Sequence, residues 1–140
     1  MVDKELVSRK LSRIRMYVDA LRRAEDINWE KYRSDLRTRA FVERYVHLAI
    51  EEVIDVANHF VSFYKWREPT SYRDLFSILR EYGVIPEDHL LTFQTMASFR
   101  NMLVHRYEAI DDELVFGIFI KHLGDFDLFI RLVTDWSTDK

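Results

Sequence analysis

Apolar residues recur at spacings of three and four along most of this chain, as on the buried face of an α-helix. The pattern predicts a first helix over Asp3–Ala24 and a second, longer one over Ser34–Tyr64, with Ser34 or Asp35 as its N-cap. A looser stretch, Glu25–Arg33, is expected to separate them. The apolar stripe of the first helix consists of Val7, Leu11, Ile14, Val18 and Leu21.

Three further helices follow from the same pattern. One is expected over Tyr72–Tyr82, where Ser71 resembles a capping residue and Gly83 suits the position after the helix. The next begins at Pro86, a favoured first-turn residue, and continues past residue 100. The last is expected over Asp111–Trp136, although its two glycines weaken its continuity. The sequence therefore predicts an all-α protein, an antiparallel up-and-down bundle of about five helices.

Composition agrees with one helical domain over residues 1–140. Hydrophobic residues make up 48% of the chain, and 3 Gly with 2 Pro are too few for an all-β protein. The absence of Cys excludes a disulfide framework, a thiolate metal site and a cysteine nucleophile. Residues 1–44 carry 12 basic and 8 acidic side chains, a bias that we interpret as a solvated basic helix face rather than a nucleic-acid track.

Neither end nor middle of the chain suggests a membrane. The first ten residues, MVDKELVSRK, contain no apolar signal core, and no apolar run nears membrane-spanning length. We therefore expect a cytoplasmic protein with no membrane association. No glycine-rich phosphate loop is present, which argues against a P-loop enzyme or a dinucleotide-binding protein.

Arg100 interrupts the apolar face of the fourth predicted helix. At about 100° per residue it projects near the middle of the arc formed by Leu90, Phe93, Met96, Ala97, Leu103 and Val104. A guanidinium cannot shed its charge, so an inward arginine is costly unless a carboxylate or a phosphate meets it. Arg100 is therefore the leading candidate for a functional residue.

His105 does not share this face, because five residues of helix place it about 140° from Arg100. Two arrangements bring the two side chains to one pocket. Either the helix ends or tightens near His105, or a second copy of the chain supplies its own motif across a two-fold axis. The alternative is that Arg100 pairs with a carboxylate inside one bundle and His105 is an ordinary surface residue.

Acidic and imidazole side chains also gather on the second predicted helix. His47, Glu51, Asp55 and His59 recur every four residues, which permits a metal site but fits a solvated stripe better. We therefore expect no metal and no cofactor. Glu52 projects toward the apolar side, with Asp55 and His59 at its edge. We predict that Glu52 or Asp55 contacts Arg100 or lines the same cleft, with His59 beside them.

The spacing Arg100, four residues, His105, one residue, Tyr107 resembles the R-x4-H-x-Y signature of HepT-like HEPN proteins. Asn101 also fits a polar position of that motif, and the order of the helices is similar along nearly the whole chain. The resemblance implies a homodimeric, metal-independent endoribonuclease toxin, with paired motifs in a cleft at the dimer interface. It also implies an MntA-like nucleotidyltransferase antitoxin that adds AMP groups to the motif tyrosine.

Carried over by position, Arg100 and His105 are the catalytic pair and Tyr107 is the AMPylated residue. Asn101 and Arg106 are candidates for binding the RNA phosphate, and Asn101 can also orient His105. These residue types suit the chemistry, because histidine transfers protons near neutral pH and arginine stabilises a charged phosphorane without a metal. The alternative is a non-catalytic helical module that binds a nucleotide or a protein through the same motif.

Overall fold

The structure is a computed structural model that describes residues 3–105 and 111–138. Within those ranges it consists of helices and connecting turns, with no strand. The helices are α1 (Lys4–Arg23), α2 (Trp29–Ser34), α3 (Leu36–Tyr64), α4 (Tyr72–Glu81), the 3-10 turn η1 (Glu87–His89), α5 (Leu90–Val104), α6 (Asp112–Lys121) and α7 (Gly124–Thr138).

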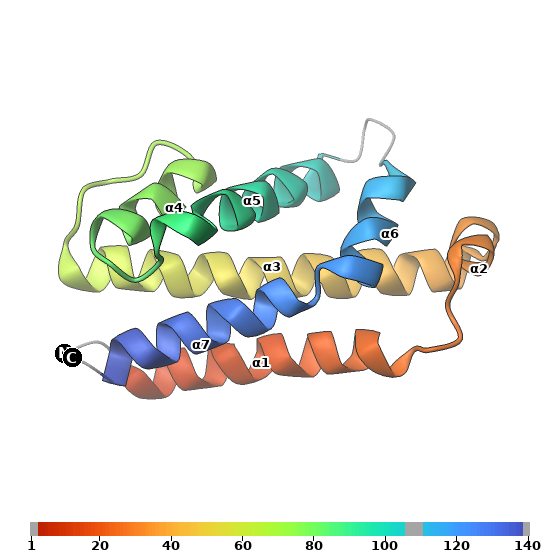
Figure 1. Ribbon diagram of the computed structural model, residues 1–140, viewed down its shortest axis with the longest axis horizontal. Helices are drawn as coiled ribbons and strands as arrows, with labels where there is room; N and C mark the ends of the chain where they lie inside the picture. The colour runs from red at the N-terminus through yellow and green to blue at the C-terminus, as the bar shows by residue number, and fades with distance from the viewer. Residues whose placement is uncertain (1–2, 106–110, 139–140) are drawn as a thin grey trace.

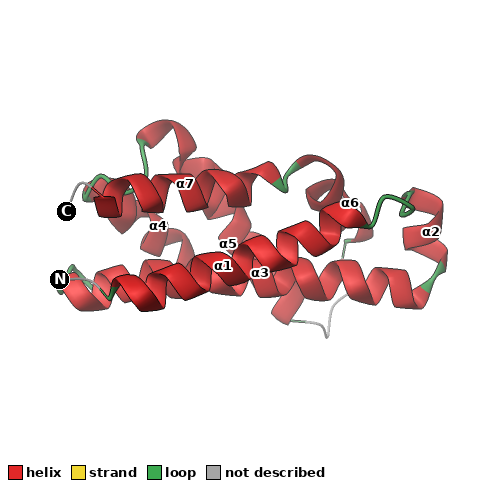
Figure 2. Ribbon diagram, turned by 90° about the horizontal axis from the view of Figure 1, so that it is seen from below, coloured by secondary structure: helices red, strands yellow, loops and turns green. Residues whose placement is uncertain are grey.

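The long helix α3 lies in the middle of the bundle, with α4 and α5 on one side and α1 and α7 on the other (Figure 1). Helices α1, α3 and α5 run in alternating directions, and α7 runs back alongside α1. The view from below shows α1 against α3, with α7 beside them (Figure 2). The predicted all-α antiparallel bundle is therefore confirmed.

The core lies on both sides of α3 and consists mainly of aliphatic side chains, together with several large aromatic ones. Five phenylalanines with no more than 1% of their surface exposed come from four helices: Phe60, Phe76, Phe93, Phe126 and Phe129. All the apolar residues predicted for the stripe of α1 are buried as well. Burial of such side chains is the main favourable term in folding, at roughly 1.5–3 kcal/mol for each large apolar residue.

Aspartate side chains cap the N-terminal ends of α1 and α3. Asp3 accepts a hydrogen bond from the backbone N–H of Leu6 at 2.9 Å and so begins α1. Of the two caps considered for α3, Asp35 fills the role: it accepts from the N–H of Arg37 at 3.2 Å and from the Thr38 hydroxyl at 2.7 Å. These side chains satisfy backbone donors that the first turn of a helix leaves unpaired.

The described residues contain seven α-helices, not about five, because two predicted segments are divided differently. Within the looser stretch Glu25–Arg33 the chain forms most of α2, which buries Tyr32 against Trp29 and Phe116. The ring centroid of Tyr32 lies 6.0 Å from that of Trp29 and 5.3 Å from that of Phe116. Six residues are too few to reveal a helical period in sequence, so this aromatic contact decides the structure.

The predicted helix over Asp111–Trp136 is two helices, α6 and α7, separated at His122 and Leu123. Leu123 is buried at this break, and the change of direction lets α6 pack near α2 while α7 lies along α1. The α-helix expected from Pro86 also starts later, at Leu90, because η1 occupies the intervening residues.

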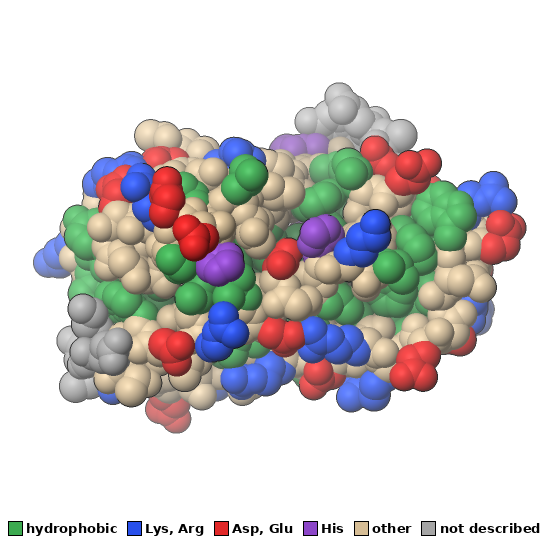
Figure 3. Space-filling model, in the orientation of Figure 1, with side chains coloured by type: hydrophobic (Ala, Val, Ile, Leu, Met, Phe, Trp, Pro, Cys, Tyr) green, Lys and Arg blue, Asp and Glu red, His purple; other side chains and the backbone are tan. Residues whose placement is uncertain are grey.

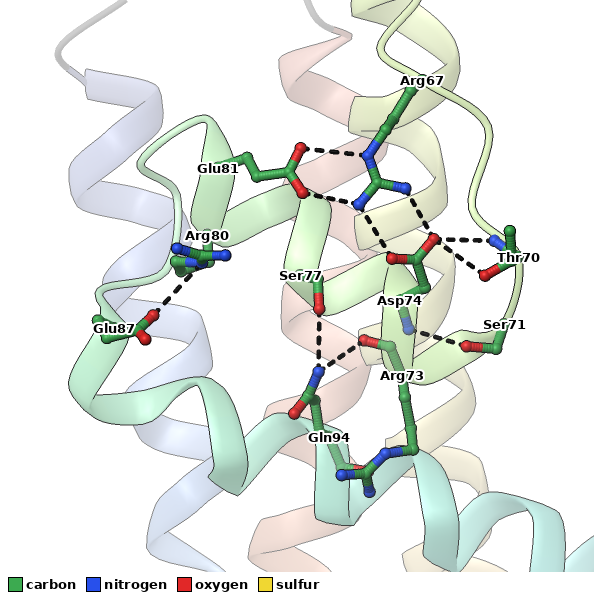
Figure 4. Close-up of polar contacts among 10 residues, drawn as sticks. All are labelled: Arg67, Thr70, Ser71, Arg73, Asp74, Ser77, Arg80, Glu81, Glu87 and Gln94. Atoms are coloured by element: carbon green, nitrogen blue, oxygen red, sulfur yellow. Dashed lines mark hydrogen bonds and ion pairs between the residues drawn. The ribbon is translucent and has the colours of Figure 1, made fainter.

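Arg67, which precedes α4, forms ion pairs with the first turn and with the last residue of that helix (Figure 4). Arg67 donates to Asp74 at 2.8 Å and to Glu81 at 2.7 Å, while Ser71 accepts from the backbone N–H of Asp74 at 2.9 Å. The hydrogen bond from Arg67 holds the pKa of Asp74 well below its usual range. The predicted Ser71 cap and the left-handed Gly83 (φ 82°) after α4 are both confirmed. This arrangement fixes where Tyr72, the first residue of α4, enters the bundle.

Hydrophobic side chains also reach the surface. Figure 3 shows hydrophobic side chains on parts of one face, including a group toward the α6 and α2 end. On α6, Leu114 and Ile120 are about half exposed (49% and 53%). No helix within residues 3–105 and 111–138 combines the length and the apolar character that a membrane span requires.

Candidate active site

Arg100 lies near the C-terminal end of α5 and faces α3. Its side chain is 20% exposed, and its Nε donates a hydrogen bond to Glu51 Oε1 at 2.7 Å. The inward position predicted for Arg100 is therefore confirmed, while its pairing with a carboxylate inside one bundle is what the alternative interpretation expected. Because the ion pair accounts for the inward position of the charge, burial alone is not evidence for a phosphate ligand.

The aromatic ring of Tyr72 covers the guanidinium of Arg100. The central carbon of the guanidinium lies 4.7 Å from the ring centroid, within the range of a cation–π contact. Tyr72 comes from α4, so Arg100 is held along one edge by α3 and over one face by α4. Two contacts in different directions define the plane of the guanidinium.

His47 lies one turn before Glu51 on α3 and contacts the same carboxylate oxygen. Its Nε2 is 3.3 Å from Glu51 Oε1, and 17% of its side chain is exposed. Burial lowers the pKa of His47; Glu51 acts to raise it, while the positive charges of Arg44 and Arg100 lower it further. The imidazole is therefore neutral at neutral pH and can donate an Nε2–H to Glu51.

His105 is the residue at which α5 ends. The last helical residue is Val104, and the His105 backbone (φ −87°, ψ 74°) leaves the helix while its N–H still donates to the Asn101 carbonyl at 3.1 Å. Helix α5 therefore ends near His105 within one chain, as the first of the two arrangements requires. His105 is exposed. The pairing of Arg100 with Glu51 and the exposure of His105 also match the alternative, in which His105 is an ordinary surface residue. The side-chain oxygen of Asn101 lies 3.4 Å from Nη1 of Arg100, a long contact.

The expected contact between Arg100 and Glu52 or Asp55 is wrong, because Glu51 makes that contact. Glu52 and Asp55 instead accept hydrogen bonds from Lys10 of α1, at 3.3 and 3.2 Å. The sequence pattern placed Glu52 toward the bundle, and it is less exposed than Glu51 (13% against 34%), but the helix it faces is α1 rather than α5. His59 lies beside the rings of Phe60 and Phe63. The roles given to Glu52, Asp55 and His59 in the site stay predictions.

Two of the predicted site residues, Arg106 and Tyr107, lie outside the described residues. In the part of the chain that the structure describes, no group of three or more His, Cys, Asp or Glu side chains is arranged to hold a metal ion. The residues of the four-residue stripe on α3 serve other contacts: Glu51 pairs with Arg100, and Asp55 pairs with Lys10.

A cavity of about 610 Å³ lies between α5, α6 and α7. Its apolar wall includes Leu91, Met96, Phe99, Leu114, Ile118 and Phe126. Neither Arg100 nor His105 is among the described residues that line it, so the cavity and the candidate active site are separate features.

The sequence pattern does not place Glu51, His47 and Tyr72 in the site. It favours a solvated stripe for Glu51 and His47 and indicates only the start of a helix at Tyr72. The signal for the first two was their i, i+4 spacing, which puts an imidazole and a carboxylate side by side on a helix. No local signal pointed to Tyr72, because its contact with Arg100 depends on how α4 packs against α5.

The model of the family described as "Ribonuclease HepT-like" matches residues 9–133, which include every described residue of this site. The chain belongs to the HepT-like ribonuclease family. The predicted family membership is thereby confirmed.

Curated relatives carry nuclease names. The chain is 24% identical over 135 residues to the "tRNA nuclease HepT" of Aphanizomenon flos-aquae, an alignment that covers 96% of this chain and 92% of that protein. It is 27% identical over 103 residues to the "mRNA nuclease HepT" of Shewanella oneidensis, which covers 74% of this chain and 77% of the relative.

Solved structures share the fold. The tri-AMPylated HEPN toxin of Shewanella oneidensis, solved in complex with its MNT antitoxin, superposes with a TM-score of 0.84 at 24% identity, over 96% of this chain and 99% of that one. YutE of Bacillus subtilis, described as a cytosolic protein of unknown function, gives a TM-score of 0.83 at 20% identity over 96% and 90% of the two chains. At these identities the likeness establishes the HEPN fold and no more.

Proposed function

We propose that this protein is a metal-independent endoribonuclease toxin of a HepT/MntA-type toxin–antitoxin pair, acting in the cytoplasm. Arg100 and His105 are its catalytic residues. The observation that carries the proposal is the contact of Glu51 with Nε of Arg100, which leaves the two amino groups of the guanidinium outside that ion pair. Membership of a ribonuclease family supports the same reaction.

Arg100 supplies charge stabilisation. Cleavage of an RNA phosphodiester passes through a phosphorane-like transition state with extra negative charge on its oxygens, which a fixed guanidinium stabilises through charge-assisted hydrogen bonds. Asn101, one residue on, can add a hydrogen bond to the phosphate, and Arg106 is proposed as a second phosphate ligand. The contacts with Glu51 and Tyr72 support this role, since they orient the guanidinium before any substrate arrives.

His105 supplies proton transfer. One proton must leave the attacking 2′-hydroxyl and one must reach the departing 5′-oxygen, and a histidine side chain can transfer either proton near neutral pH. We propose a homodimer in which two copies of His105 divide these roles across the two-fold axis. A mixed dimer with one His105→Ala subunit then loses most of its activity, and full activity of that mixed dimer would rule out the division.

The proposed regulation acts on Tyr107. An MntA-like nucleotidyltransferase partner transfers AMP groups from ATP to the Tyr107 hydroxyl and releases pyrophosphate. The added bulk and negative charge next to the catalytic pair repel RNA phosphates. The relatives solved with an MNT antitoxin support this partner class. Replacing Tyr107 with Phe keeps the toxin active but makes it insensitive to the antitoxin.

Inducible expression in a bacterial host tests the proposal. Wild-type protein stops growth, while Arg100→Ala and His105→Ala proteins, expressed to the same level, do not. Arg80→Ala and His122→Ala are matched controls, because both side chains lie elsewhere and pair with Glu87 and Asp125. Equal growth with wild type and all four variants, each shown to be folded by its thermal melt, would instead favour a non-catalytic binding module.

A further inference from the structure

The carboxylate that holds Arg100 is itself held by a second residue. Arg100 Nε donates a hydrogen bond to Glu51 Oε1 at 2.7 Å, and His47 Nε2 lies 3.3 Å from the same oxygen, so nitrogen atoms of two side chains contact one oxygen. The last torsion of a glutamate is broad and roughly two-fold, which lets a carboxylate with a single partner rotate. A second nitrogen in contact with the same oxygen restricts that rotation.

His47 is better placed to act as an anchor than Glu51 is. Its side chain is half as exposed (17% against 34%), and it lies on the same helix, so its distance from Glu51 is set by the geometry of α3. Arg100 reaches Glu51 from a different helix, α5. The backbone of α3 therefore positions His47, His47 restrains the carboxylate of Glu51, and Glu51 holds the guanidinium of Arg100.

The charge state of His47 suits this position. Burial lowers its pKa, and Arg44 and Arg100 act in the same direction against the opposing effect of Glu51. A neutral imidazole donates one hydrogen bond without adding a positive charge that would compete with Arg100 for the carboxylate.

We infer that His47 is a positioning residue of the nuclease: through Glu51 it fixes the guanidinium of Arg100, which Tyr72 covers from the other direction, in the orientation that the transition state requires. The inference rests on the ribonuclease function proposed above. Its energetic basis is preorganisation, because a catalytic group displaced by as little as about 1 Å can cost roughly a hundredfold in rate.

Two substitutions at one position separate positioning from packing. In His47→Gln the amide nitrogen can still donate to Glu51 one turn away, whereas His47→Leu fills similar space without a donor. We expect His47→Leu to lower kcat for RNA cleavage about tenfold or more with KM nearly unchanged, and His47→Gln to stay within about threefold of wild type. His89→Leu, at a half-buried histidine in η1, is the matched control and leaves kcat unchanged.

An NMR measurement reports on the position of Arg100 without any nuclease assay. The Nε–H resonance of Arg100, assigned by its disappearance in Arg100→Lys, is expected to be shifted and protected from exchange with water in wild type and in His47→Gln. In His47→Leu it moves toward the position of a solvated arginine and exchanges faster. If wild type cleaves no RNA, the nuclease proposal fails, and this resonance still decides whether His47 positions Arg100.

The positioning role is overturned if His47→Leu leaves both kcat and the Arg100 resonance as in wild type. It is also overturned if His47→Gln and His47→Leu lose activity equally, because an amide donor would then not replace the imidazole. Recovery with Gln but not with Leu is the result that a merely structural histidine would not produce.

Discussion

Glu51 Oε1 and Arg100 Nε, 49 positions apart in sequence, lie 2.7 Å apart and join α3 to α5 at the candidate active site. Both side chains are partly exposed, so solvent screens the pair and its net contribution to stability is small. Its main effect is on geometry, since it sets which edge of the guanidinium faces the carboxylate. We therefore interpret this ion pair as a feature of the site rather than a support of the fold.

Replacing Glu51 with Gln separates these two effects. The amide keeps an oxygen that can accept from Arg100 but removes the charge and the preference for one orientation. We expect the free energy of unfolding, measured in urea, to change by about 1 kcal/mol or less. The rate of RNA cleavage should fall about tenfold or more. A large loss of stability with unchanged activity would show that the pair serves the fold.

Arg100→Lys tests whether the shape of the cation matters as well as its charge. An ammonium group cannot contact Glu51 through an Nε edge, stack on Tyr72 and still present two amino groups to a phosphate. We expect RNA cleavage to fall about hundredfold, close to the effect of removing one donor to a transition-state oxyanion. Single-turnover cleavage rates measure this effect. Activity close to wild type in Arg100→Lys would mean that a point charge is sufficient.

His47 predicts a specific pH dependence of stability. Its folded pKa lies below the ordinary value of about 6.5, so between these two pKa values the unfolded chain binds a proton that the folded chain does not. The contribution is therefore favourable at neutral pH and is lost as pH falls through about 6.5. Between about pH 7.5 and pH 5.5, wild type should lose more unfolding free energy than His47→Gln in urea titrations. Equal losses in the two proteins would mean that His47 titrates normally.

The start of α4 offers a test of the support under Tyr72. Ser71 accepts from the N–H of Asp74 at 2.9 Å, and Tyr72 follows it directly. Ser71→Ala should cost about 1 kcal/mol in the free energy of unfolding, as for other N-cap serines. Ser8→Ala, at an exposed interior position of α1, is the control and should be neutral or slightly stabilising. If both variants unfold alike, Ser71 does not act as a cap.

Sequence periodicity was sufficient for the long helices because their apolar stripes are continuous, as in α1 and α3. It failed where the outcome depended on distant packing. Helix α2 forms in a stretch with no visible period, where Tyr32 is buried against Phe116. One predicted helix is interrupted between α6 and α7, where Leu123 is buried.

In the candidate site, too, some features follow from local spacing and others depend on how distant helices pack. The inward position of Arg100 follows from local spacing, and the structure agrees with it. The end of its helix near His105 is one of the two arrangements that the spacing left open. Choosing among neighbouring acids on α3 was not possible from the sequence, because Glu51 and Glu52 differ by only about 100° of helix rotation. That rotation decides whether a carboxylate faces α5 or α1, and only the packing of the helices fixes it.

The sharpest test of metal-independent catalysis by Arg100 and His105 is RNA cleavage by the purified protein in the presence of EDTA. Wild type should cut RNA without added metal and leave 2′,3′-cyclic phosphate ends, because the 2′-hydroxyl is the attacking group. Arg100→Ala and His105→Ala should lose about hundredfold or more in rate while remaining folded. If RNA stays intact after incubation with wild type, or if all three proteins cleave it equally, the proposed mechanism is wrong.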